Sequence, residues 1–199
     1  FRFQSDANTA DYSEFFYQGD AGAESGDVMV IDNSLPSEAS DTGRVRKSSS
    51  PYDSKLLGVV TIHGKGTGYN NPDDTRQNDS NFAEVGLLGH VYTKVSTENG
   101  PITAGDYLTS SSTPGVAMKA TKPGPTVGKA LEEFTDDSGK IMVFVNVSYA
   151  DPGNFFASLS FDENGNLIIP KIKTGSLILD SSLATAPAQL SVSGDQLAL

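Results

Sequence analysis

The residues of this sequence that could do chemistry begin with two carboxylates near its start. Asp11 and Glu14 lie in the segment DYSEFFY, which also holds four aromatic residues. Two carboxylates held close together raise the pKa of one of them, and such a pair can serve as general acid and base. The alternative is that the aromatic side chains belong to the core and the carboxylates bond to a neighbouring turn. We favour this alternative and expect no catalytic residue.

A second set of acidic residues could bind a metal. Asp73, Asp74 and Asp79 lie in the long polar segment from His63 to Asn81, and oxygen ligands of this kind suit Ca²⁺. Their spacing does not match the EF-hand pattern, so we favour a solvated loop and expect no metal site and no cofactor. The chain has two histidines and no cysteine, which excludes a thiolate nucleophile, a disulfide and a cysteine-ligated metal.

The elements that must position these residues are predicted to be β-strands, because short apolar segments alternate with Gly, Pro, Ser and Asp turns along most of the chain. Two stretches follow one plan. The first contains Gly26-Asp27, Val45-Arg46-Lys47 and Leu57-Gly58-Val59, and the second contains Gly105-Asp106, Ala117-Met118-Lys119 and Val127-Gly128-Lys129. We therefore expect an all-β, compact, barrel- or sandwich-like domain with an internal twofold repeat of a β-unit.

One further strand is predicted from Lys140 to Ser148, KIMVFVNVS, which is almost continuously made of β-forming apolar residues. A run of this kind is typical of a strand buried on both faces. We expect it to be the central strand of the domain, which we place at residues 1–149.

The remaining segment, residues 150–199, is predicted to be an extended β-tail. Asp162 to Asn166 contains an Asn-Gly turn and predicts a hairpin loop. Strands as short as those around it cannot bury a core alone, so their apolar face needs the domain or another copy of the chain as cover. This favours strand addition to a neighbour or an intertwined stalk. The residues that need cover are Leu177, Ile178, Leu179, Leu183, Leu190, Val192, Leu197 and Leu199.

The net charge of the chain argues against a nucleic-acid partner. With 14 Lys and Arg against 25 Asp and Glu, the net charge is −11. This field repels phosphate backbones, and no basic stripe with interleaved aromatic residues is present, so we expect no nucleic-acid partner. No apolar run reaches the ~18 residues that a membrane span requires, so we expect no membrane span.

Several segments, taken in order, resemble a known family. DYSEFF, GDVMVID and RVRKSSSPYDSKLLGVV together look like the self-cleaving C-terminal domain of phage neck-appendage and tail-fibre proteins. The same order, continued by GPITAGDYLTSSSTPGVAMKA and TVGKALE, is similar to fibre-like surface proteins of uncultured bacteria. The likeness covers about residues 8–149, and the later segment SFDENGNLIIPKIKTGSLILD resembles the β-stalk units of trimeric tail fibres.

The resemblance implies an intramolecular chaperone that helps three chains trimerise and then cuts itself off by a glutamic-type mechanism. Only its Asp-aromatic-x-Glu motif carries over, onto Asp11 and Glu14. The long segment after Tyr149 departs from a terminal chaperone, and we therefore lean away from an enzyme.

These observations favour a structural subunit of an extracellular fibre, filament or tail-fibre-like appendage, on a cell surface or a virion. Its partner is itself, in a trimer or a helical filament. One alternative is the autoproteolytic chaperone domain. A second alternative is a surface module that binds glycans through the residue 63–81 loop and surface aromatic residues. Independently of these functions, an intramolecular crosslink between Lys and Asn or Asp could take the place of disulfides.

Overall fold

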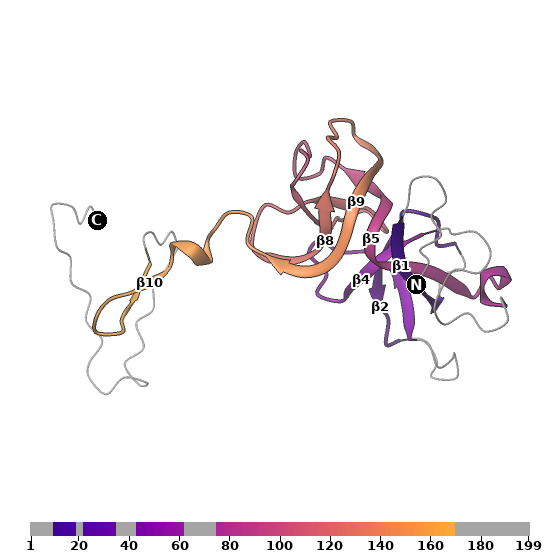
Figure 1. The fold of residues 1–199 in the computed structure, drawn as a ribbon, viewed down its shortest axis with the longest axis horizontal. Coiled ribbons are helices and arrows are strands. Elements are labelled where there is room, and N and C mark those ends of the chain that lie inside the picture. Colours follow the sequence, from indigo (N-terminus) through magenta and orange to yellow (C-terminus); the bar gives the residue numbers. More distant parts are fainter. Residues whose placement is uncertain (1–9, 19–21, 35–42, 62–74, 170–199) are drawn as a thin grey trace. The chain divides into compact units, whose positions relative to one another are not determined.

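A computed structural model describes residues 10–18, 22–34, 43–61 and 75–169 (Figure 1). These residues form strands and two short 3-10 turns, with no α-helix among them, so the predicted all-β class is confirmed. No helix in this part of the chain is long and apolar enough to cross a membrane. The elements are β1 (Ala10–Gln18), β2 (Val28–Ile31), β3 (Arg44–Lys47), β4 (Leu56–Val60), η2 (Arg76–Asn78), β5 (Phe82–Ser96), β6 (Tyr107–Ser110), β7 (Ala117–Lys119), β8 (Gly124–Ala130), β9 (Ser138–Ala150), η3 (Phe156–Ser158), β10 (Ser160–Phe161) and β11 (Leu167–Ile168).

The chain divides into two compact units, Phe1–Phe156 and Ala157–Leu199. We call them the ring unit and the tail unit. The ring unit holds β1 to β9, and the tail unit holds the β10–β11 hairpin. The boundary that we expect from the sequence, between residues 149 and 150, stays a prediction.

The nine strands of the ring unit form one mixed sheet that closes on itself twice. Its order is β1-β3-β2-β4-β5-β7-β6-β8-β9, with added pairings of β1 with β5 and of β5 with β9. The first five strands in this order therefore make one closed ring, and the last five make another. We call them the first ring and the second ring. β5 belongs to both and lies between β1 and β9 (Figure 1).

The two rings share one pairing scheme. β1 runs parallel to β3, as β5 does to β7, and every other neighbouring pair is antiparallel in both rings. The register agrees as well: Val45 lies opposite Gln18, and its predicted counterpart Ala117 lies opposite Val95. The turn glycines Gly26 and Gly105 have φ of +92° and +94°. The predicted internal repeat is confirmed.

A close approach of two backbones recurs at the same place in each ring. A Cβ added at Gly58 would lie 2.3 Å from the carbonyl oxygen of Gly86, and one at Gly128 would lie 2.2 Å from that of Phe144. No side chain fits at such distances. Glycine at these two matched positions is therefore what lets β4 reach β5 and β8 reach β9.

Each ring has an apolar interior, and the larger of two buried clusters joins the rings. The smaller cluster lies in the first ring and contains Met29, Val45, Val60, Ala83 and Val85. The larger cluster is centred on the second ring and takes in side chains from β2 and β4 of the first. Its members are Val28, Val30, Leu56, Val59, Val91, Val95, Ile102, Leu108, Ala117, Val127, Ala130, Ile141, Val143 and Val145. Burial of apolar surface thus holds the rings together as one unit.

β9 corrects one prediction. It pairs with β5 on one side and β8 on the other, but only one of its faces is buried. Val143 and Val145 point into the core, whereas Phe144 and Asn146 are exposed. A strand of a closed ring has one inner face, so apolar residues on its outer face remain at the surface. The expectation of a strand buried on both faces was wrong.

Candidate functional site

The end of β9 and the turn after it carry large apolar side chains at the surface. Tyr149, Phe155 and Phe156 are each at least half exposed. The Phe156 ring contacts the other two: its centroid lies 6.4 Å from that of Tyr149, in a tilted arrangement, and 5.4 Å from that of Phe155, edge to face. Asp151 holds the turn because its carboxylate accepts a hydrogen bond from the Phe156 amide at 2.5 Å. We call residues 147–156 the exit segment. It presents an aromatic cluster to solvent.

The tail unit contributes a second exposed apolar surface. β10 and β11 pair antiparallel, with Ser160 opposite Ile168 and Phe161 opposite Leu167, which confirms the predicted hairpin. Each strand is two residues long, and Phe161, Leu167 and Ile168 are 71%, 50% and 46% exposed. The hairpin therefore has no core of its own among the described residues.

The hairpin loop is nevertheless well defined by hydrogen bonds. The Asp162 carboxylate accepts the backbone N–H groups of Asn164 and Asn166, both at 2.9 Å, and the Asn166 side-chain amide at 2.8 Å. The bonds from Asn166 hold the pKa of Asp162 below its ordinary value. The loop fixes the register of two strands whose apolar side chains lack cover.

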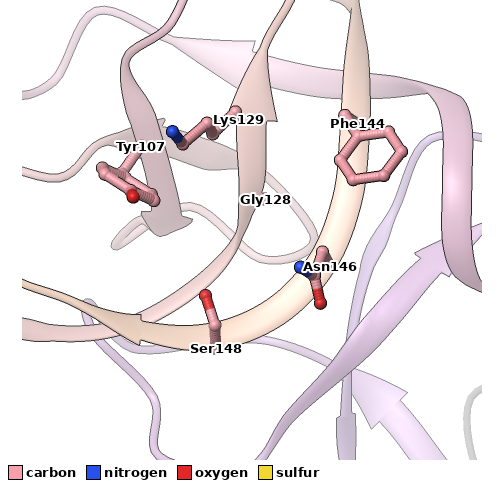
Figure 2. Close-up of a pocket in the computed structure, with 6 residues that line it drawn as sticks. All are labelled: Tyr107, Gly128, Lys129, Phe144, Asn146 and Ser148. Atoms are coloured by element: carbon pink, nitrogen blue, oxygen red, sulfur yellow. The ribbon is translucent and has the colours of Figure 1, made fainter.

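A shallow groove lies on the outer face of the second ring. It has a volume of about 350 Å³ and is lined by Tyr107, Gly128, Lys129, Phe144, Asn146 and Ser148 (Figure 2). The Lys129 ammonium lies 4.5 Å from the centre of the Tyr107 ring. Across the groove, the Phe144 ring makes an edge contact with His90 at 5.8 Å. No pattern in the sequence pointed to this groove, because its residues meet only through the pairing of β6, β8 and β9.

The two carboxylates singled out for acid–base chemistry lie on β1. This segment is a strand throughout, so alternation puts Asp11 and Glu14 on opposite faces. Glu14 accepts a hydrogen bond from the Tyr12 hydroxyl at 2.5 Å. The Asp11 carboxylate lies beside Gly86, where an added Cβ would meet its Oδ2 at 2.6 Å. β1 does not bring the two carboxylates together, and their catalytic role stays a prediction.

Ser13, between them, has a partner that sequence reasoning missed. Its hydroxyl donates a hydrogen bond to the Glu84 carboxylate at 2.7 Å, and both side chains are buried. Glu84 follows from no local pattern. It could be found only from the register of β1 against β5, in which Phe15 lies opposite Glu84.

The metal candidates are only partly described. Asp79 closes a local turn, since its carboxylate accepts the Asn81 amide at 2.9 Å. Asp73 and Asp74 lie outside the described residues. Within the described part of the chain, no three His, Cys, Asp or Glu side chains gather where a metal ion could bind. The predicted assembly residues, from Leu177 to Leu199, also lie outside the described residues.

The Asp and Lys residues that the repeat matches form ion pairs in both the first and the second ring. The sequence repeat by itself did not reveal these pairs. In the first ring, Asp27 lies 3.1 Å from the Lys47 ammonium and 2.6 Å from that of Lys94. In the second, Asp106 lies 2.8 Å from the Lys119 ammonium. Each Asp–Lys pair ties the turn before β2 or β6 to the next strand of the chain, β3 or β7, which is its neighbour in the sheet. They are structural contacts.

Two groups at these sites, Lys94 and Asp106, have pKa values shifted in the direction that favours the charged form. Burial opposes the ionisation of Lys94, but hydrogen bonds to Asp27 and Glu24 outweigh it and raise the Lys94 pKa. Burial likewise opposes ionisation of Asp106, but hydrogen bonds from Lys119 and Thr103 hold its pKa below the ordinary value. A Lys–Asp crosslink needs a neutral amine as nucleophile. The raised pKa of Lys94 disfavours that chemistry between Lys94 and Asp27.

Comparison with known proteins finds no matching family model and no matching curated protein. Among solved structures, the chain is similar to the C-terminal fragment of bacteriophage phi29 gene product 12, with a TM-score of 0.43 and 15% identity over 68% of this chain and 100% of that one. It is also similar to the pre-mature form of gene product 12, with a TM-score of 0.43 and 15% identity over 69% of this chain. This chain spans 22% of the length of that pre-mature protein.

Proposed function

We propose that the protein is a structural subunit that assembles with copies of itself, through β-strands of its tail unit, into an extracellular fibre or appendage. The observation that carries this proposal is the β10–β11 hairpin, whose described strands bury no side chain. A two-stranded ribbon is marginal in water on its own. Cover from further strands supplies the missing apolar burial.

The occupant of this surface is a second copy of the same chain. Residues 170–199 continue the tail with eight of the apolar residues that need cover and with few charges. Each chain thus brings both an exposed ribbon and further apolar segments that can add to a ribbon edge. A homomeric assembly supplies identical ribbons at matched positions without any other partner.

The exit segment supports the same role. Its aromatic cluster comes immediately before the tail unit, so exposed apolar side chains run from Val147 to Ile169. Aromatic residues are enriched at the centres of protein interfaces. In this proposal the exit segment, which ends the ring unit, contributes apolar side chains to the interface in addition to those of the tail unit.

The ring unit has the features of a rigid body carried by the assembly. Both rings are closed, so their strands offer few free edges for unwanted pairing. Both buried clusters lie before residue 156, so the ring unit contains the whole of the described core. It can therefore be tested without the tail.

The test compares the full chain with a chain that ends at Phe156, by multi-angle light scattering and negative-stain electron microscopy. We expect oligomers or filaments from the full chain and monomers from the shortened one. Circular dichroism and a cooperative thermal transition establish that the shortened chain is folded. Assembly of the folded shortened chain, or a monomeric full chain, would contradict the proposal.

A further inference from the structure

A row of side chains crosses three strands on the outer face of the second ring. Tyr107 of β6 lies opposite Lys129 of β8, and Lys129 lies opposite Phe144 of β9. Directly opposed residues point to the same face. Asn146 and Ser148 lie further along β9 and line the same groove. Together these side chains line the groove (Figure 2).

The hollow arises from an irregularity in the pairing of β8 with β9. The register shifts between Thr126 and Gly128, which stand opposite Ser148 and Val145. Such a shift bends the strands and redirects side chains. Gly128 lines the groove at the same place and contributes only backbone atoms to it.

The first ring shows what this face looks like when protein covers it. The repeat matches Tyr107 with Val28 and Lys129 with Val59, and both valines are fully buried in the cluster that joins the rings. In the second ring the same positions carry a phenol and an ammonium, and they remain accessible. Because polar side chains stand here in place of the two valines, this face is better suited to bind a polar ligand than to pack against another ring of strands.

The groove chemistry is that of a saccharide site. Phe144 and Tyr107 supply apolar ring surface against which the C–H groups of a sugar can pack. Asn146 can both donate and accept hydrogen bonds, and the Ser148 hydroxyl, which lies 3.1 Å from the Thr126 hydroxyl, can do the same. Hydroxyl groups of a sugar require partners of this mixed kind.

Lys129 adds a preference for an acidic sugar. Its ammonium is the only charged group among the lining residues that the structure describes, and the Tyr107 ring holds it at 4.5 Å by a cation–π contact. A charge-assisted hydrogen bond to a carboxylate is stronger than a neutral one. Because the whole chain carries a charge of −11, long-range attraction does not deliver the ligand, and recognition depends on these contacts.

We propose that this groove binds a saccharide that carries a carboxylate, with Lys129 on the carboxylate, Phe144 beneath the sugar ring, and Asn146 and Ser148 on its hydroxyls. All of its lining residues belong to the ring unit, so loss of the tail-unit hairpin does not remove the site. A volume of about 350 Å³ fits one or two sugar rings.

The experiment is saturation-transfer difference NMR on the full chain, which suits weak ligands of large assemblies. The probes are digalacturonate and its neutral counterpart of the same linkage, galactobiose. We expect saturation transfer to digalacturonate, with weaker transfer to galactobiose. K129Q should lower the affinity for digalacturonate about tenfold and leave that for galactobiose nearly unchanged.

Phe144→Ala should lower the affinity for both probes, and Asn146→Ala provides a second groove variant should Phe144→Ala lose the native fold. The matched control is K122Q, because Lys122 makes the same kind of contact with Tyr52, at 4.6 Å, outside the groove. We expect this control to bind like the wild type.

Three results would overturn the assignment. The first is a dissociation constant for digalacturonate weaker than about 10 mM. The second is equal binding of the neutral probe, and the third is an equal loss in K129Q and K122Q, which would indicate non-specific attraction.

Discussion

The first and second rings are two versions of one design, and their matched aspartates differ in surroundings. Asp27 is 1% exposed and lies between two ammonium groups, whereas Asp106 is 21% exposed and has one. Part of the difference comes from Lys94, which lies on β5, the strand that the two rings share. Gly115 also lies against the Asp27 carboxylate. The same turn is thus buried where the rings meet and partly open where they do not. Whether the Gly-Asp turn lies where the two rings meet therefore decides how deeply its aspartate is buried.

The outer faces differ in the same way. Val28 and Val59 of the first ring are buried against the second, whereas their counterparts Tyr107 and Lys129 line an open groove. A duplicated unit that packs against its twin buries one copy of a face and leaves the other free. The free copy can then acquire polar chemistry without cost to the core.

The largest effect that separates the rings is expected at Asp27. Asp27→Asn leaves the Lys47 and Lys94 ammonium groups without their shared carboxylate, and breaking a buried ion pair costs about 3–5 kcal/mol. We expect a loss near the lower end of this range, because both lysines are partly exposed and can recover some hydration. Urea denaturation of the full chain measures it. A loss no greater than that of Asp106→Asn would remove the distinction between the two sites.

The next effect should be equal in the two rings. Gly58→Ala and Gly128→Ala each push a Cβ against a carbonyl oxygen of the neighbouring strand and should cost about 2–3 kcal/mol of unfolding free energy. Gly153→Ala is the matched control, because an added Cβ there meets no atom within 4 Å. Thermal unfolding of the three variants checks the prediction. A large loss in only one ring would mean that the rings do not share this contact.

Asp106→Asn should have a smaller effect. The pair with Lys119 is partly exposed, and such ion pairs contribute about 1 kcal/mol or less. Two hydrogen bonds from Thr103, from its amide at 2.8 Å and its hydroxyl at 2.9 Å, still reach this side chain in the variant. Denaturation at neutral pH measures the loss. A loss of the size expected for Asp27→Asn would show that exposure does not set the strength of these pairs.

The smallest effect is a dependence on pH in the second ring. The pKa of Asp106 is lower in the folded chain than its ordinary value, so its ionised form stabilises the fold above that ordinary value. This stabilisation is lost as the pH falls through the lowered pKa. The difference in unfolding free energy between the wild type and Asp106→Asn should therefore shrink below about pH 4. A difference that stays constant to lower pH would contradict the ionised state of Asp106.

Local signals in the sequence predict most of the ring unit. Strands form at VMVI, RVRK and LLGVV, which belong to the first of the two stretches that predict the β-unit, and the repeat of Gly-Asp, Lys and Leu-Gly-Val elements is present in space. These features depend on turn residues and alternation, which act over a few positions. The Asn-Gly hairpin of the tail unit follows from the same kind of signal.

What the sequence could not predict depends on long-range register. The closure of two rings through β5, the reach of Lys94 to Asp27, and the bond from Ser13 to Glu84 all join residues far apart in the chain. The exposure of Phe144 could not be read from KIMVFVNVS, because an apolar run does not say which face meets solvent. The groove could not be predicted either, because its residues come from three strands whose pairing the sequence does not reveal.

The comparison between the ring unit and the tail unit gives the most direct test of the assembly function. The hairpin variant F161S/L167S/I168S removes three exposed apolar side chains from the tail unit, and I31S/L88S/L131S removes three of similar exposure from the ring unit. Sedimentation velocity of the full chain in both forms measures the assembly state. We expect the hairpin variant to sediment as a folded monomer and the ring-unit variant to assemble like the wild type. Assembly of the hairpin variant, or its loss only in the ring-unit variant, would contradict the central claim that the tail unit joins the copies.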